Sequence, residues 1–212
     1  MKALAKNTHN VIRLPKTEAS SFRQAFNSLL AENESLRNEL SELRTFRALA
    51  YRDPLTGLWN RRYFDDRLAE EISRTRRKPD YPFTLLLVDV NDLKLVNDQR
   101  GHGAGDDLLR FVASFLEAGT RAHDLVCRLG GDEFGIILPD CNVSQALAVK
   151  ARLCAQLEAA NGRRSHCVGL SIGAATCADG LMADALLQLA DVAMYADKRR
   201  QKTGRSLSSV AP

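Results

Sequence analysis

The stretch "RLGGDEFGIIL", residues 128–138, constrains the fold more than any other part of the sequence. Two apolar runs, "DLVCRL" and "EFGIIL", are joined by two glycines and an acid, a pattern that predicts an antiparallel hairpin with a tight turn. Asp132 and Glu133 would then stand side by side at its tip. Because exposed turns also favour Gly and acidic residues, the hairpin alone establishes no function.

The elements around this hairpin follow a recognisable order. We expect a strand at "FTLLLVDV", a helix at 104–118, the hairpin, a helix at 144–160, a strand at "CVGLSIGAAT" and a final helix over 181–202. This β-α-β-β-α-β-α order is that of the ferredoxin-like fold. It predicts an α+β domain with a central antiparallel sheet and helices on one face.

A different pattern precedes this domain. Residues 1–17 are polar, and we expect them to be disordered, whereas 18–50 read as a coiled-coil dimerisation helix. Apolar residues recur every seven positions, and opposite charges occupy the flanking positions of a parallel pair. The alternative is one amphipathic helix packed on its own domain. The heptad d positions are Phe22, Leu29, Leu36 and Leu43, and the a positions are Phe26, Asn33 and Leu40.

Composition indicates which partners and which cellular compartment to expect. A net charge of +4 with scattered basic residues indicates a solvated surface and no nucleic-acid partner. The five cysteines form no CxxC pair and fall in apolar patterns, as expected of reduced, buried thiols. No apolar run approaches the length of a membrane span, and the start lacks a signal-peptide core. We therefore expect a cytoplasmic protein without a membrane partner.

Acidic residues at one end of the predicted sheet suggest a metal site. Asp89 ends the first strand and would lie near Asp132 and Glu133 if that strand pairs with the hairpin. Two carboxylates 4 Å apart repel by about 4 kcal/mol at an effective dielectric constant near 20. A divalent cation would relieve this repulsion, and oxygen ligands of this kind suit Mg²⁺ or Mn²⁺.

The segment "DVNDLKLVNDQRGHGAGDD", residues 89–107, carries groups that suit a nucleotide. Lys94 offers a cation for a phosphate tail. Asn97 and Asp106 together offer the donors and acceptors that read a guanine edge. The glycines at 101, 103 and 105 do not follow a strand directly and are spaced GxGxG, so a dinucleotide fingerprint is disfavoured.

Five ordered blocks together resemble a GGDEF domain, the catalytic module of bacterial diguanylate cyclases. They are "DPLTGLWNRRYF", "VDVNDLKLVNDQRGHGAGD", "RAHDLVCRLGGDEF", "LSIGAA" and "ADVAMYADK". The resemblance places the domain at 51–205, followed by a flexible tail at 206–212. It implies a palm of the nucleotidyl cyclase and polymerase type. It also implies that two such domains meet, each holding one GTP, to form cyclic di-GMP and two pyrophosphates.

The resemblance also implies a role for each matching residue. Asp89, the carbonyl of Val90 and Asp132 would hold Mg²⁺, while Glu133 would bind metal or share with Asp132 the removal of the 3′-hydroxyl proton. Asn97 and Asp106 would contact guanine. The residues matched to phosphate are Lys94 and Lys198, with Lys202 an open case because the helix ending differs from that of the family.

Two further features bear on regulation and activity. "RAHD" matches the family's inhibitory RxxD site, so Arg121 and Asp124 would bind the product; a surface salt bridge is the alternative. The family commonly has Asp where Asn91 stands and Phe where Leu93 stands, but neither is a matched metal ligand. The competing hypotheses are a non-catalytic cyclic di-GMP receptor and a coiled-coil scaffold.

Overall fold

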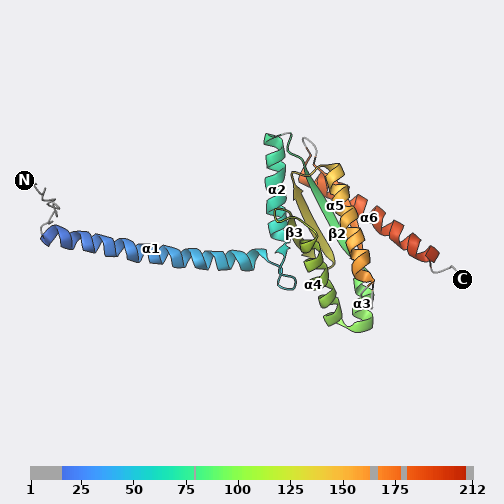
Figure 1. Cartoon of the computed structure of the whole chain (residues 1–212), viewed down its shortest axis with the longest axis horizontal. Coiled ribbons are helices and arrows are strands. Elements are labelled where there is room, and N and C mark those ends of the chain that lie inside the picture. Colours follow the sequence, from blue (N-terminus) through green and yellow to red (C-terminus); the bar gives the residue numbers. More distant parts are fainter. Residues whose placement is uncertain (1–15, 79, 163–166, 178–180, 209–212) are drawn as a thin grey trace, which may run out of the picture. The chain divides into compact units, whose positions relative to one another are not determined.

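A computed structural model of the chain describes residues 16–78, 80–162, 167–177 and 181–208, which fall into two units, residues 1–50 and 51–212 (Figure 1). Most of the predicted disordered start, 1–17, lies outside the described residues, as do positions 209–212 of the predicted tail, 206–212. The backbone of residues 206–208, which the prediction assigned to the tail, belongs to the last helix.

The described part of the first unit is the helix α1, Lys16–Tyr51, whose last residue already belongs to the second unit. It contains no Gly or Pro, which explains its uninterrupted length of 36 residues. Its heptad residues Leu29, Leu36 and Leu43 are each more than half exposed. Burying one such side chain is worth about 1.5–3 kcal/mol, so a row of them favours contact with another helix. The coiled-coil dimer stays a prediction.

The second unit is built on a five-stranded sheet in the order β1-β3-β4-β2-β5. Strand β2 pairs antiparallel with β4 and β5, and β4 pairs antiparallel with β3, as the ferredoxin-like order predicts. The two-residue β1 adds a parallel edge beside β3 that the sequence pattern did not indicate. The strand bounds are Trp59–Asn60, Phe83–Asn91, Leu125–Gly130, Glu133–Pro139 and Gly169–Thr176 for β1 to β5.

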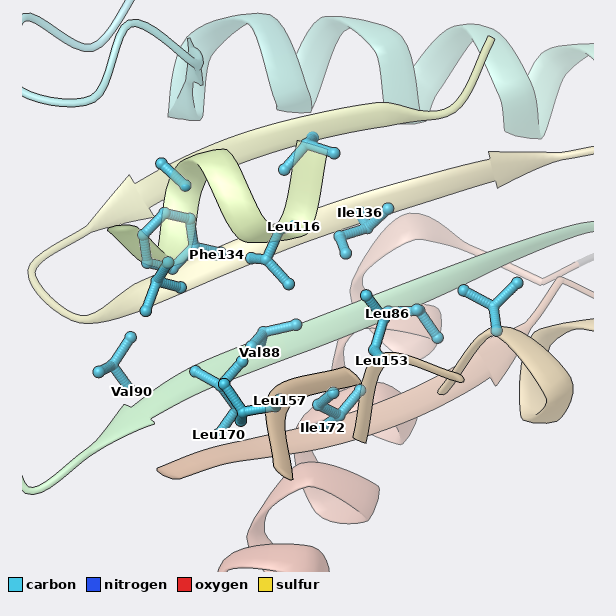
Figure 2. Packing of buried hydrophobic residues seen from close by; sticks show 14 of the residues in the cluster. Leu86, Val88, Val90, Leu116, Phe134, Ile136, Leu153, Leu157, Leu170 and Ile172 are labelled. Carbon is cyan, nitrogen blue, oxygen red and sulfur yellow. The ribbon is translucent and has the colours of Figure 1, made fainter. Parts of the chain in front are cut away.

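Helices cover both faces of the sheet, so the prediction that they lie on one face is wrong. On one face, α4 (His102–Ala118) and α5 (Val143–Asn161) pack against Leu86 and Val88 of β2 (Figure 2). On the other face, α2 (Arg61–Arg77) and α6 (Ala183–Ser208) pack against the alternate residues of that strand, such as Leu85.

The composition of β2 explains this three-layer arrangement. Every residue from Phe83 to Val90 is buried, so both faces of the strand need apolar cover. Helix α2 supplies part of that cover with Phe64 and Leu68, both almost completely buried.

Among the described residues, no helix is both long and apolar enough to span a membrane.

Candidate active site

The end of β2 and the hairpin turn are held together by strand pairing. Asp89 is the register partner of Glu133, and the backbone N–H of Val90 donates to the carbonyl of Asp132 at 2.9 Å. Gly130 and Gly131 have φ values of 140° and 53°, which side chains rarely adopt. The two glycines therefore allow the turn that brings the paired acids beside the strand end.

The three acids have different environments. Residues opposite each other in an antiparallel pair point to the same face, so Asp89 and Glu133 share the face that α2 and α6 cover. Asp89 is 7% exposed, Asp132 is half-buried and Glu133 is exposed. Nowhere in the described part of the chain do three His, Cys, Asp or Glu side chains converge into a preformed metal cluster. The expected tight triad is therefore not preassembled, although its carboxylate donors are of the type that Mg²⁺ prefers.

A lysine neutralises Asp89 in this structure. The ammonium of Lys198, on α6, donates to Asp89 Oδ1 at 2.7 Å. Partial burial lowers the pKa of Lys198, but the hydrogen bond that its ammonium donates to Asp89 and the charges of Asp89, Asp132 and Asp92 outweigh this effect and raise the pKa overall. The raised pKa is the effect of the negative charge at this end of the sheet on a neighbouring cation.

The two residues matched to guanine recognition lie on neighbouring helices. Asn97 is on α3 (Leu93–Arg100), and Asp106 is near the start of α4; both are half-buried. Within the described part of the chain, Asn97 Oδ1 is the buried side-chain oxygen that has no hydrogen-bond partner. A Cβ at Gly105 would lie 1.9 Å from that oxygen, so the glycine makes room for the amide. An unsatisfied buried acceptor is costly, and a bound donor would relieve it.

The other two lysines matched to phosphate, Lys94 and Lys202, are exposed. Lys94 is on α3, directly after β2, and Lys202 is one turn beyond Lys198 on α6. Of the three lysines, Lys198 is therefore the one that the structure places against a site acid.

The RxxD segment forms a compact turn. The Asp124 carboxylate accepts a hydrogen bond from the backbone N–H of Arg121 at 2.7 Å, while the Arg121 side chain is exposed. The surface salt bridge between these two residues, considered as an alternative, is thus replaced by a backbone cap. Both residues line a cavity of about 200 Å³ together with Arg52 and Trp59. Arg52 stacks over the Trp59 ring at 3.5 Å from its centroid.

Sequence reasoning assigned no role to an ion pair that supports the hairpin. Arg128 Nη1 donates to the two carboxylate oxygens of Asp53 at 3.1 and 3.2 Å, and Arg128 Nη2 donates to the carbonyl of Gly131 at 2.8 Å. Asp53 also caps the turn at Thr56. The Asp-Pro start of "DPLTG" signals a turn, but the partner 75 residues away has no local signal.

Comparison with known proteins identifies the family of this fold. The family model described as "Diguanylate cyclase, GGDEF domain" matches residues 50–204. The response regulator PleD of Caulobacter vibrioides is 40% identical over 156 residues, covering 71% of this chain and 34% of PleD. Diguanylate cyclase TpbB of Pseudomonas aeruginosa is 33% identical over 223 residues, covering 98% of this chain and 51% of TpbB. The chain thus spans from about a third to a half of these relatives.

Similar solved structures come from the same family. Diguanylate cyclase SiaD of Pseudomonas aeruginosa, in complex with its activator SiaC, has a TM-score of 0.72 at 29% identity, covering 87% of this chain and 72% of that one. The coiled coil and GGDEF domain of DgcB from Caulobacter crescentus, in complex with cyclic di-GMP, has a TM-score of 0.70 at 28% identity, covering 84% and 95%. The strand-end acids, the hairpin and these matches lead to one conclusion: the chain belongs to the diguanylate cyclase GGDEF domain family.

Proposed function

We propose that the protein is a diguanylate cyclase, which condenses two GTP molecules into cyclic di-GMP with release of two pyrophosphates. The observation that carries the proposal is the pairing of Asp89 with Glu133 at the end of β2, beside the Asp132 turn and under Lys198. Relatives named diguanylate cyclase share this domain with the chain. In such a site the protein mainly positions the phosphates and neutralises their charge.

Asp89, the carbonyl of Val90, Asp132 and Glu133 would hold Mg²⁺ or Mn²⁺. When bound, the metal supplies charge neutralisation at the triphosphate and makes the 3′-hydroxyl more acidic. The chain's own acids complete the chemistry, because Asp132 or Glu133 accepts the proton of that hydroxyl. The buried position of Asp89 and the exposed position of Glu133 fit a division between metal anchoring and proton transfer.

Substrate recognition falls to the groups around this edge of the sheet. Asn97 and Asp106 would bind guanine, and the unpartnered Asn97 oxygen supports a ligand that brings a donor. Asp89 would be one of the metal ligands, and Lys198 would contact a phosphate oxygen of the substrate, with Lys94 and Lys202 adding positive charge nearby.

Each domain would hold one GTP, so the reaction needs two chains. A parallel coiled coil of α1 would raise the effective concentration of one domain near its partner. The exposed Leu29, Leu36 and Leu43 at heptad spacing support such a homodimer. The similarity to a structure that includes a coiled coil with its GGDEF domain also supports it.

Cyclic di-GMP would inhibit the enzyme at the RxxD turn. The cavity beside Arg121 and Asp124 offers a guanidinium for a phosphate and a carboxylate for a guanine. The aromatic ring of Trp59 at the cavity wall adds an apolar surface.

The test is incubation of the full chain with GTP and Mg²⁺, followed by identification of the product. We expect Glu133→Gln to reduce formation of cyclic di-GMP by at least about a hundredfold, as loss of a general base does. Glu158→Gln, at an exposed position of α5, is the matched control and should keep full turnover. Full activity of Glu133→Gln would reject the site assignment. Wild-type binding of cyclic di-GMP without turnover would identify a receptor instead.

A further inference from the structure

Strand β5 is the last strand of the described sheet, so it has one edge without a strand partner. Side chains from two helices cover the backbone groups of that edge. Asp197 of α6 accepts from the N–H of Ile172 at 2.9 Å, and Lys150 of α5 donates to the carbonyl of the same residue. Gln201 of α6 donates to the carbonyl of Leu170 at 2.8 Å. The edge bonds therefore attach α6 to β5 at two successive turns of the helix.

The helix also approaches the strand very closely. A Cβ at Gly173 would lie 2.1 Å from the carbonyl oxygen of Ala190 and 2.2 Å from the nitrogen of Met194. Backbone thus rests on backbone at this point, which leaves α6 little freedom to slide. Lys198 lies between Asp197 and Gln201 in the sequence, and its side chain reaches the neighbouring strand β2 at Asp89.

Asn91 connects this attachment to β2. Its Oδ1 accepts from the Ser171 hydroxyl at 2.8 Å, and its Nδ2 donates to Gln201 Oε1 at 2.9 Å. Both ends of the Gln201 amide are hydrogen-bonded: its nitrogen donates to the carbonyl of Leu170, and its oxygen accepts from Asn91. A carboxylate at position 91 can accept from Ser171 but has no hydrogen to donate to Gln201. The amide at position 91 is therefore matched to this contact.

We propose that Asn91 and Gln201 are positioning residues that hold the ammonium of Lys198 over Asp89. They act through α6: the bond between the two amides fixes the helical turn that carries Lys198 against the ends of β2 and β5. The consequence for catalysis rests on the proposed function, in which Lys198 contacts the nucleotide phosphates. It also gives a reason for the amide at position 91, where the family commonly has an acid.

The first experiment measures the NMR signal of the Lys198 ammonium in the protein without substrate or metal. The ¹H–¹⁵N signal of its side-chain ammonium, assigned by its loss in Lys198→Arg, should be visible in the wild type because the group is paired with Asp89. We expect Gln201→Met, which keeps size and helix propensity, to broaden this signal or shift it toward that of a free lysine. Arg199→Gln, at an exposed neighbour, should leave the signal unchanged.

The same contact can be tested from the Asn91 side and by enzyme activity. Asn91→Leu should change the Lys198 signal in the same direction as Gln201→Met, and the double variant should change it by less than the sum of the two, because both substitutions remove the hydrogen bond between the amides. In turnover assays each single variant should lower kcat/KM for GTP by about three- to tenfold, which is the change in rate expected when the net free energy of one hydrogen bond is lost. Arg199→Gln should turn over normally.

The outcomes separate the positioning role from the function itself. A merely structural role would lower Tm but leave the Lys198 signal and kcat/KM of the folded variants unchanged, and this result would overturn the proposal. So would the absence of a protected Lys198 signal in the wild type. If the wild type forms no cyclic di-GMP, the proposed function fails, while the ammonium signal still decides whether Asn91 and Gln201 position Lys198.

Discussion

Replacement of Asp53 by Asn tests whether the turn at the start of the domain holds the hairpin of β3 and β4 in place. The Asp53 carboxylate accepts from the Thr56 N–H at 2.9 Å and from the Thr56 hydroxyl at 2.6 Å, and it also pairs with Arg128. Asn keeps a neutral oxygen for the Thr56 cap but loses the charge that faces the guanidinium. The substitution therefore removes mainly the link to Arg128.

The magnitude follows from the burial of the pair. The side chains of Arg128 and Asp53 are 13% and 17% exposed, so solvent screens their interaction only in part. A hydrogen bond to a charged group contributes about 1.5–3 kcal/mol, and we expect Asp53→Asn to lower the free energy of unfolding by about 2 kcal/mol. In a domain of this size, that corresponds to a fall in Tm of roughly 4–8 °C.

The expected pH dependence has a definite sign. Burial raises the pKa of Asp53, but the hydrogen bonds from Thr56 and the contact with Arg128 outweigh it and hold the pKa below its usual value of 3.8. A lowered carboxylate pKa contributes stability that is complete above pH 3.8 and is lost as the pH falls through the folded-state pKa. The difference between wild type and Asp53→Asn should thus be constant from about pH 8 to 5 and shrink only in stronger acid.

Thermal and urea unfolding of the full chain at one protein concentration provide the measurement. A double-mutant cycle with Arg128→Met isolates the coupling between the two side chains. The control is Asp65→Asn, which breaks an exposed pair with Arg61 at 4.0 Å and should change stability by less than about 1 kcal/mol. A coupling energy below about 0.5 kcal/mol would refute the argument that this ion pair supports the hairpin.

Three other substitutions, the first with its own control, test separate parts of the structure. Gly173→Ala should destabilise the domain by about 3 kcal/mol in urea unfolding because its Cβ would meet the α6 backbone, whereas Gly103→Ala, with open space around it, should not destabilise it. Arg121→Ala should raise the concentration of cyclic di-GMP needed for half-inhibition by at least about tenfold through loss of a charged contact; equal inhibition of both proteins would exclude the RxxD turn as the product site. Leu36→Glu should shift sedimentation from dimer to monomer and reduce activity at low protein concentration; an unchanged dimer would contradict the coiled coil.

Local patterns were sufficient for much of the fold. The apolar run that became β2 and the glycine turn of the hairpin depend on neighbours in sequence, and both elements lie where their patterns predict. Helix α2 has few apolar residues, among them Phe64 and Leu68, and its charged remainder concealed its packing role. The part of α2 in covering the second face of the sheet was therefore missed, although the last helix, which packs on the same face, was predicted.

In the candidate site, too, the residue types could be read from the sequence, whereas their contacts could not. The residue types at positions 89, 132 and 133 led to the prediction of a cation site, and this stays a prediction because their side chains do not converge into a cluster in the described part of the chain. The structure adds that Lys198 supplies a counter-charge to Asp89 across 109 positions of sequence. The sequence could not show that Asn97 would have a buried oxygen without a partner, because this depends on how α3 packs against α4.

The amino-acid sequence by itself determined four of the five strands, β2 to β5, together with the hairpin turn, the long first helix and the chemical types at one end of the sheet, because periodicity and turn residues act over a few positions. Only the tertiary structure decided which charges pair. Arg128 with Asp53, Lys198 with Asp89 and the amide pair of Asn91 and Gln201 each join distant segments. Such contacts are set by how distant helices, strands and turns pack together, and no local pattern encodes their geometry.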